Sequence, residues 1–202
     1  LNKNKVVAGG IYTEADASGD IHKYCVNLGH VLSSKYGVKF RFNEQVKDIH
    51  GLDTPIVSTN KEDIPFDKVI ICAGVKTQEF RNKFGDNFRI YPVKGYSITI
   101  DLHDEISRNA APYVSIKDDN SKIVSSRLGN RLRVAGTAEL AGENKEIRKE
   151  RITPLVEWVN DCFPEINTDN FITWAGLRPM TSDMVPVMRE SKRKNVFYNS
   201  GH

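Results

Sequence analysis

Four apolar residues recur at helical spacing near the start of the chain: Ile21, Cys25, Leu28 and Leu32. They follow a turn over 16–20 that offers several N-cap residues. The pattern predicts a helix to about Tyr36, ended by Gly37.

Alternating patterns on either side of this helix predict short strands. Lys5–Tyr12 is one, broken by Gly9-Gly10, where backbone is able to approach another group closely. Val38–Phe42 is a second, because its apolar and basic residues alternate. Two further extended pieces cover Val46–Ile49 and Pro55–Thr59.

The run Val69–Gly74 is continuously apolar and ends in small residues. Such a run is typical of a parallel strand buried on both faces. Its small end favours a ligand site, since open α/β sheets bind ligands at the carboxyl ends of their strands. A tight turn into a helix over Lys76–Phe84 explains the small residues equally well.

From Arg89 onwards the pattern is mostly extended. Four strands are predicted in succession, with a hairpin turn at Gly129-Asn130, which favours an antiparallel sheet and a second domain. A helix follows over Glu143–Phe163, kinked at Pro154 or restarted there behind Thr153. The predicted strands of this half cover Ile90–Leu102, Pro112–Ile116, Lys122–Leu128, Arg131–Ala135, Phe171–Arg178 and Val196–Asn199.

The stretch Trp174–Val187 places one arginine, Arg178, directly before Pro179. A following proline biases Arg178 toward an extended backbone. A guanidinium at a strand end suits a bidentate grip on a carboxylate or phosphate. A structural salt bridge at a domain boundary is the alternative.

Composition describes a soluble globular protein: 202 residues, 39% apolar and 27% charged. The net charge of +3 is too weak to indicate nucleic acid. Three dispersed cysteines favour a reducing compartment. The five histidines show no metal-ligand spacing, and neither a nucleophile elbow nor a phosphate-binding glycine motif is present. Two basic clusters, at 148–151 and 192–194, are interpreted as solvated surface, with an acidic partner or membrane surface as the alternative.

Five segments in family order resemble the D-amino-acid dehydrogenase branch of the FAD-dependent amine and amino-acid oxidoreductases. They are Tyr12–Asp20, Val69–Val75, Tyr91–Ser97, Arg131–Glu139, and Trp174–Val187 running on to Ser200–His202. The resemblance implies an α/β (α+β) fold, in which an incomplete FAD-binding Rossmann-type layer is interleaved with an antiparallel substrate domain. The implied flavin-binding ranges are 16–84 and 176–202, and the substrate domain covers 1–15 and 85–175.

The resemblance also assigns roles to individual residues. Cys72, Ala73 and Gly74 are expected to border the dinucleotide part of FAD, and the backbone of Val46 its adenine. Gly95 lies in a segment expected to enter the flavin and substrate pocket, with Tyr96 as pocket wall or hydrogen-bonding partner; plain sheet packing is the alternative for Tyr96. Arg178 is expected near the isoalloxazine and the substrate carboxylate, and Gly201 and His202 at the flavin's pyrimidine end.

The implied reaction is oxidative deamination of a D-amino acid to a 2-oxo acid and ammonia, by hydride transfer from Cα to flavin N5. The family's N-terminal glycine fingerprint is absent, so we expect the chain to be the C-terminal part of a longer enzyme, inactive alone. A glycine or sarcosine oxidase and a cofactor-free remnant are the alternatives. The expected acceptor is a quinone or respiratory-chain component, and the expected location is cytoplasmic or peripheral on the inner face of the cytoplasmic membrane.

Overall fold

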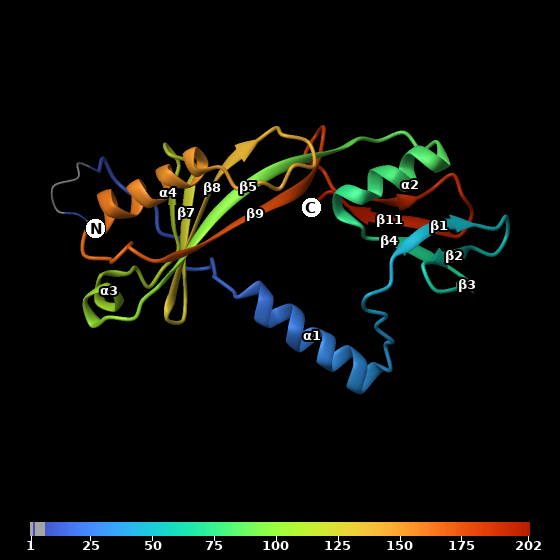
Figure 1. The fold of residues 1–202 in the computed structure, drawn as a ribbon, viewed down its shortest axis with the longest axis horizontal. Coiled ribbons are helices and arrows are strands. Elements are labelled where there is room, and N and C mark those ends of the chain that lie inside the picture. Colours follow the sequence, from blue (N-terminus) through green and yellow to red (C-terminus); the bar gives the residue numbers. More distant parts are fainter. Residues whose placement is uncertain (1, 3–6) are drawn as a thin grey trace. The chain divides into compact units, whose positions relative to one another are not determined.

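A computed structural model of the chain describes residue 2 and residues 7–202 (Figure 1). The chain divides into two compact units. Residues 16–35, predicted to belong to the flavin-binding domain, cluster with the first unit, and the predicted division into flavin-binding and substrate domains stays a prediction. Unit 1 comprises Leu1–Lys35, Lys94–Glu139 and Asn144–Gly176; unit 2 comprises Tyr36–Val93, Leu140–Glu143 and Leu177–His202.

The first predicted helix is confirmed as α1 (Ile21–Tyr36). Asp20 begins it, because its carboxylate accepts hydrogen bonds from the backbone N–H groups of His22 and Lys23. Gly37 ends it with a φ of 66°. The helix has no buried residue among those described.

Two predicted strands near α1 are wrong. Residues 7–12 are irregular and exposed, while residues 5 and 6 of that prediction lie outside the described part of the chain. The Val38–Phe42 segment is also irregular. Its two aromatic rings stack on each other at 5.6 Å between centroids, and both are exposed. An alternating pattern forms a strand only where a neighbouring strand accepts its hydrogen bonds.

A five-stranded sheet in the order β6-β7-β8-β5-β9 belongs mainly to unit 1, while the first residues of β5 and the last residues of β9 belong to unit 2 (Figure 1). The antiparallel prediction is confirmed for pairs β6–β7, β7–β8 and β5–β8. The hairpin turn lies at Gly129-Asn130 as expected, with a φ of 65° at the glycine. The strands are β5 (Ile90–Asp101), β6 (Ile116–Asp118), β7 (Ile123–Leu128), β8 (Arg131–Glu139) and β9 (Phe171–Thr181).

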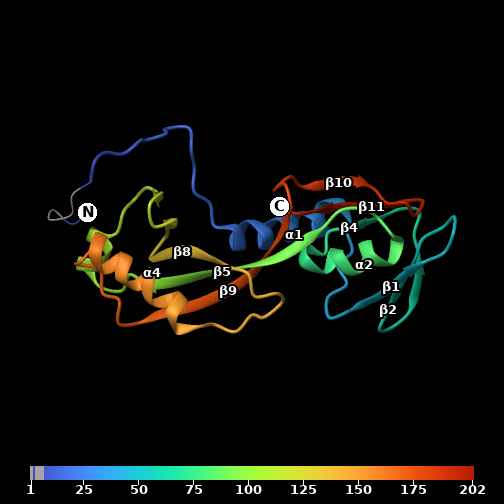
Figure 2. The same cartoon turned by 90° about the horizontal axis from the view of Figure 1, so that it is seen from above.

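Helix α4 (Lys149–Cys162) covers one face of this sheet (Figure 2). It begins four residues before Thr153, so Thr153 is not its N-cap, and Pro154 lies inside it. Leu155 and Val159 of the helix are fully buried in the same hydrophobic core as Ile98 and Val134 of the sheet. The sequence missed α3 (Glu105–Ala110), whose N-cap Asp104 accepts a hydrogen bond from the Ser107 N–H.

Unit 2 contains two three-stranded sheets. In the first, β1 (Val46–His50), β2 (Ile56–Thr59) and β3 (Asp63–Pro65) run antiparallel. In the second, the order is β10 (Val187–Glu190), β11 (Val196–Ser200) and β4 (Val69–Ile71). β11 pairs parallel with β4, and the turn η1 (Gly74–Lys76) leads from β4 into α2 (Thr77–Phe84).

The interpretation of Val69–Gly74 as a strand buried on both faces is wrong. β4 is only three residues long and forms one edge of its sheet, so that Ile71 is 4% exposed but Ile70 is 64% exposed. An apolar run predicts burial of both faces only where the chain supplies a layer for each. Its parallel pairing and the helix that follows agree with the sequence.

Candidate functional site

The two parallel strands of unit 2 end side by side. The register pairs Val69 with Val196 and Ile71 with Tyr198, so Gly74 and Gly201 follow neighbouring carboxyl ends. The hydroxyl of Ser200 links these ends by donating to the Gly74 carbonyl oxygen at 3.2 Å. Thr77, fully buried at the start of α2, donates in turn to the Ser200 hydroxyl oxygen at 3.1 Å.

At the carboxyl ends of these strands, the backbone of Gly74 is accessible to a ligand. Gly74 has a φ of 56°, and a Cβ built on it would meet nothing within 4 Å. Cys72 and Ala73 are exposed just before it, and His202 is exposed just after Gly201. Small residues at the carboxyl ends of parallel strands are where an open α/β sheet receives a nucleotide. Such a backbone fits one part of FAD, and the predicted contact of these residues with its dinucleotide part stays a prediction.

Gly201 is required by its surroundings as well as by its backbone. Its φ is 88°, and a Cβ there would lie 2.8 Å from the Thr181 methyl carbon and 3.7 Å from the Pro179 carbonyl oxygen. The backbone at Gly201 therefore lies very close to β9. Arg178 precedes Pro179 on β9, and its predicted place beside the flavin site stays a prediction.

Arg178 lies on β9 with an exposed side chain. Among the described residues, no carboxylate forms an ion pair with it. The alternative of a structural salt bridge thus has no partner in the described part of the chain. The predicted role of Arg178 in binding a carboxylate stays a prediction.

Tyr96 and Gly95 belong to unit 1, on β5. Gly95 pairs with Ala138 of β8, and a register irregularity separates it from Tyr96. Tyr96 is 1% exposed, and its hydroxyl donates to Glu139 Oε2 at 2.5 Å. The tyrosine is thus packed in the sheet with an occupied hydroxyl, and its predicted part in a substrate pocket stays a prediction.

Val46 begins β1 and is 43% exposed. It lines a cavity of about 300 Å³ together with Val57, Phe66 and Val69. The apolar walls would suit a flat ring, and the predicted contact between the Val46 backbone and adenine stays a prediction.

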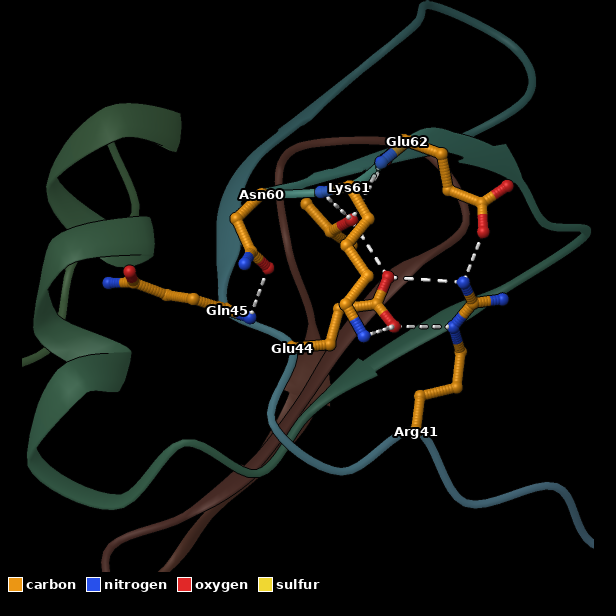
Figure 3. A network of polar contacts seen from close by, with 7 residues as sticks. Arg41, Glu44, Gln45, Asn60, Lys61 and Glu62 are labelled. Carbon is orange, nitrogen blue, oxygen red and sulfur yellow. Dashed lines mark hydrogen bonds and ion pairs between the residues drawn. The ribbon is translucent and has the colours of Figure 1, made fainter.

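A polar network at the rim of this cavity escaped the sequence analysis (Figure 3). Arg41 forms a bidentate pair with Glu44, at 2.9 and 3.1 Å, and also contacts Glu62. Thr59 donates to Glu44 at 2.8 Å. Hydrogen bonds from Arg41 and then Thr59 lower the pKa of Glu44. Arg41 and Glu44 are three residues apart in an irregular segment, so no periodic pattern marks them.

The described part of the chain contains no group of three or more histidine, cysteine or acidic residues placed to hold a metal ion. None of its helices combines the length and apolar character needed to span a membrane.

Several solved structures share the fold of this chain. The chain superposes on glycine oxidase from Bacillus cereus with a TM-score of 0.67 and 24% identity, covering 79% of this chain and 44% of that one. It superposes on L-proline dehydrogenase from P. horikoshii with a TM-score of 0.73 and 16% identity, covering 88% and 49%. At these identities the likeness defines the fold alone, a mixed α/β architecture with antiparallel sheets.

Residues 2–202 match the family described as DAO, FAD dependent oxidoreductase, and the chain belongs to that family. D-amino acid dehydrogenase 3 of Mesorhizobium japonicum is 46% identical over 199 residues, which are 96% of this chain and 48% of that protein. D-amino acid dehydrogenase of Neisseria meningitidis is 35% identical, over 97% of this chain and 47% of that protein. The chain spans about half the length of the curated relatives it matches.

Proposed function

We propose that this chain is part of a FAD-dependent oxidoreductase that converts D-amino acids into 2-oxo acids and ammonia. The observation that carries the proposal is the adjacency of Gly74 and Gly201 at the ends of two parallel strands of unit 2, where Gly74 leaves the backbone open. Arg178, exposed on β9 and without an ion-pair partner among the described residues, supports it. The names of the relatives support the substrate class, because they describe D-amino acid dehydrogenases.

The residues have separate parts in this proposal. When bound, the flavin accepts the electrons removed from the substrate, and the protein supplies position and charge. Backbone at Cys72–Gly74 and at Gly201 would approach the cofactor closely. Arg178 would bind the substrate carboxylate through a charge-assisted, bidentate contact, and this would orient Cα for the reaction.

We also propose an acceptor other than oxygen, of the quinone or respiratory-chain type, reached by peripheral attachment to the inner face of the cytoplasmic membrane. The word dehydrogenase in the relatives' names supports this acceptor class. A glycine or sarcosine oxidase is the second candidate, supported by the fold shared with glycine oxidase.

The test uses the complete protein, purified with its flavin. We expect D-amino acids to reduce an artificial quinone or dye, and the L-enantiomers to leave it oxidised. Peroxide release with glycine or sarcosine, without dye reduction by D-amino acids, would replace the proposal by the second candidate. Purified protein without flavin absorbance would favour a cofactor-free remnant.

A further inference from the structure

A basic cavity of about 330 Å³ lies in unit 2, away from the residues discussed so far. Its lining combines four cationic and two apolar residues: Lys83, Lys192, Arg193, Lys194, Leu52 and Phe84. The three consecutive cations occupy the turn between β10 and β11, which the sequence analysis interpreted as solvated surface.

Asp86, which is 4% exposed, is hydrogen-bonded to the start of this turn. Its carboxylate accepts hydrogen bonds from the Ser191 hydroxyl at 2.6 Å, the Tyr198 hydroxyl at 2.7 Å and the Lys192 backbone N–H at 2.8 Å. The Ser191 N–H also donates to the Val196 carbonyl oxygen at 2.8 Å. Asp86 is therefore occupied by the backbone and by neutral hydroxyls, and does not pair with a cation of the cavity.

Two of the four cations already have carboxylate partners. Lys83 pairs with Asp48, and Lys194 pairs with Asp53 at 2.9 Å.

The other two cations make hydrogen bonds to neutral groups. The Lys192 ammonium donates to the Gly85 carbonyl oxygen at 2.7 Å, and Arg193 Nη2 donates to the Gly51 carbonyl oxygen at 2.6 Å. Among the described residues no carboxylate forms an ion pair with Lys192 or Arg193. Counting Asp86 beneath the turn, four cations stand against three carboxylates, and Lys192 and Arg193 are the two cations without an ion-pair partner among the described residues.

Two contacts orient the guanidinium of Arg193. Its guanidinium carbon lies 5.7 Å from the centroid of the Phe84 ring, in addition to its bond to Gly51. Stacking on an aromatic face fixes the plane of a guanidinium and lowers the entropy lost when it binds an anion.

The cavity is at the opposite end of the parallel strands from the candidate flavin site. Residues 192–194 precede the first residue of β11, whereas Gly201 follows its last residue. Asn195, next to the cations, accepts through its carbonyl oxygen from the Val69 N–H at the start of β4. A ligand in the basic cavity therefore does not compete with a flavin at the strand ends.

We propose that this cavity binds a phosphate or phosphodiester group. Arginine and lysine are the residues that recognise phosphate oxygens, the first as a fork and the second as a point charge. Leu52, 86% exposed at the rim, and Phe84 give an apolar surface for the organic part of such a ligand. The phosphate is supplied either by a soluble phosphorylated molecule or by the headgroup of an anionic lipid.

The experiment measures binding of two probes to the complete protein. Inorganic pyrophosphate is titrated by calorimetry, and vesicles of phosphatidylglycerol in phosphatidylcholine are tested by cosedimentation, each at low and high salt. The variant Lys192→Gln/Lys194→Gln is compared with Lys39→Gln, which removes an exposed lysine of the same unit outside the cavity. We expect the double variant to weaken binding at least about tenfold, and Lys39→Gln to leave it unchanged.

Each outcome decides the proposal. Binding of pyrophosphate assigns the site to a soluble phosphate, and binding of vesicles without pyrophosphate assigns it to a lipid headgroup; both support the proposal if the double variant loses the binding. No binding of either probe by the wild type, or equal weakening by Lys39→Gln, overturns it. If the double variant melts early, Lys192→Arg must retain the affinity while Lys192→Glu abolishes it. Flavin absorbance should be the same in all variants.

Discussion

Tyr96 donates its hydroxyl to Glu139 Oε2 across 2.5 Å, joining β5 to β8 inside unit 1. The same oxygen lies 3.0 Å from the ammonium of Lys94, which is fully buried. Hydrogen bonds from Tyr96 and then Lys94 hold the pKa of Glu139 below its usual range. The two residues on either side of Gly95 are therefore tied to one carboxylate, which Arg148 also contacts at 2.9 Å.

Replacement of Tyr96 by Phe is expected to lower the free energy of unfolding by about 1.5–3 kcal/mol, because a hydrogen bond to a buried charged acceptor is lost. Chemical denaturation measures it, with Tyr91→Phe on the same strand as control, since Tyr91 is 46% exposed. A variant of unchanged stability whose KM for the amino acid rises would mean that the hydroxyl serves the substrate and not the sheet.

Asp118 should make the stability of unit 1 fall at acidic pH. It accepts a hydrogen bond from the Trp158 ring N–H at 2.8 Å, and this bond, with others from Ser121 and Asn120, lowers its pKa to about 2 from the model-compound value of 3.8. A carboxylate whose pKa is lower in the folded state stabilises the fold above its unfolded pKa, and this contribution is lost as the pH falls toward the folded value.

We therefore expect the stability of the wild type to fall between about pH 4 and pH 2, in part through Asp118. Asp118→Asn should be less stable at neutral pH and should lose less on acidification. Thermal melts across this range, with Asp169→Asn as a surface control, measure the difference. Parallel curves for wild type and Asp118→Asn would show that Asp118 does not titrate with unfolding.

Gly201→Ala tests the close approach of the Gly201 backbone to β9. Alanine at a φ of 88° is strained, and its methyl group would lie 2.8 Å from the Thr181 side chain. Gly142→Ala is the matched control, because Gly142 has a φ of 58° and nothing within 4 Å. We expect the control to lose about 1 kcal/mol through backbone strain, and Gly201→Ala to lose roughly 1–3 kcal/mol more through the overlap. Equal losses would contradict the crowding at Gly201.

Periodic sequence patterns predicted the elements whose partners lie within this chain. The helix from Ile21, the hairpin at Gly129-Asn130 and the strand Ile90–Leu102 appear close to their expected bounds. Each is specified by local signals, such as a capping aspartate or a turn glycine, or by alternation against a neighbouring strand of the same chain. Val38–Phe42 has the alternation without a partner strand, and there the prediction failed.

The sequence marks the residues of the candidate site but not their spatial arrangement, and their roles stay predictions. The glycines and Arg178 stand out in the sequence through their neighbours, whereas the contact of Gly201 with Thr181 and Pro179 arises from strand pairing that no local pattern records. The same holds for the long-range contacts between Asp86 and Ser191 and between Lys94 and Glu139. Polar residues in such contacts have no periodicity, because their partners are set by the tertiary fold.

Arg178→Met tests the proposed substrate contact in the complete enzyme. Loss of a charge-assisted bond to the substrate carboxylate should raise the KM for the amino acid roughly 10- to 100-fold, while Arg178→Lys should recover part of the loss by keeping the charge without the bidentate fork. Arg89→Met, which removes another exposed arginine of unit 2, is the control. Flavin absorbance per chain is measured alongside, so that a loss of cofactor is distinguished from a loss of substrate binding. An unchanged KM in Arg178→Met with full flavin content would remove Arg178 from this role, and the carboxylate would then have to be bound by a group outside the strand-end site.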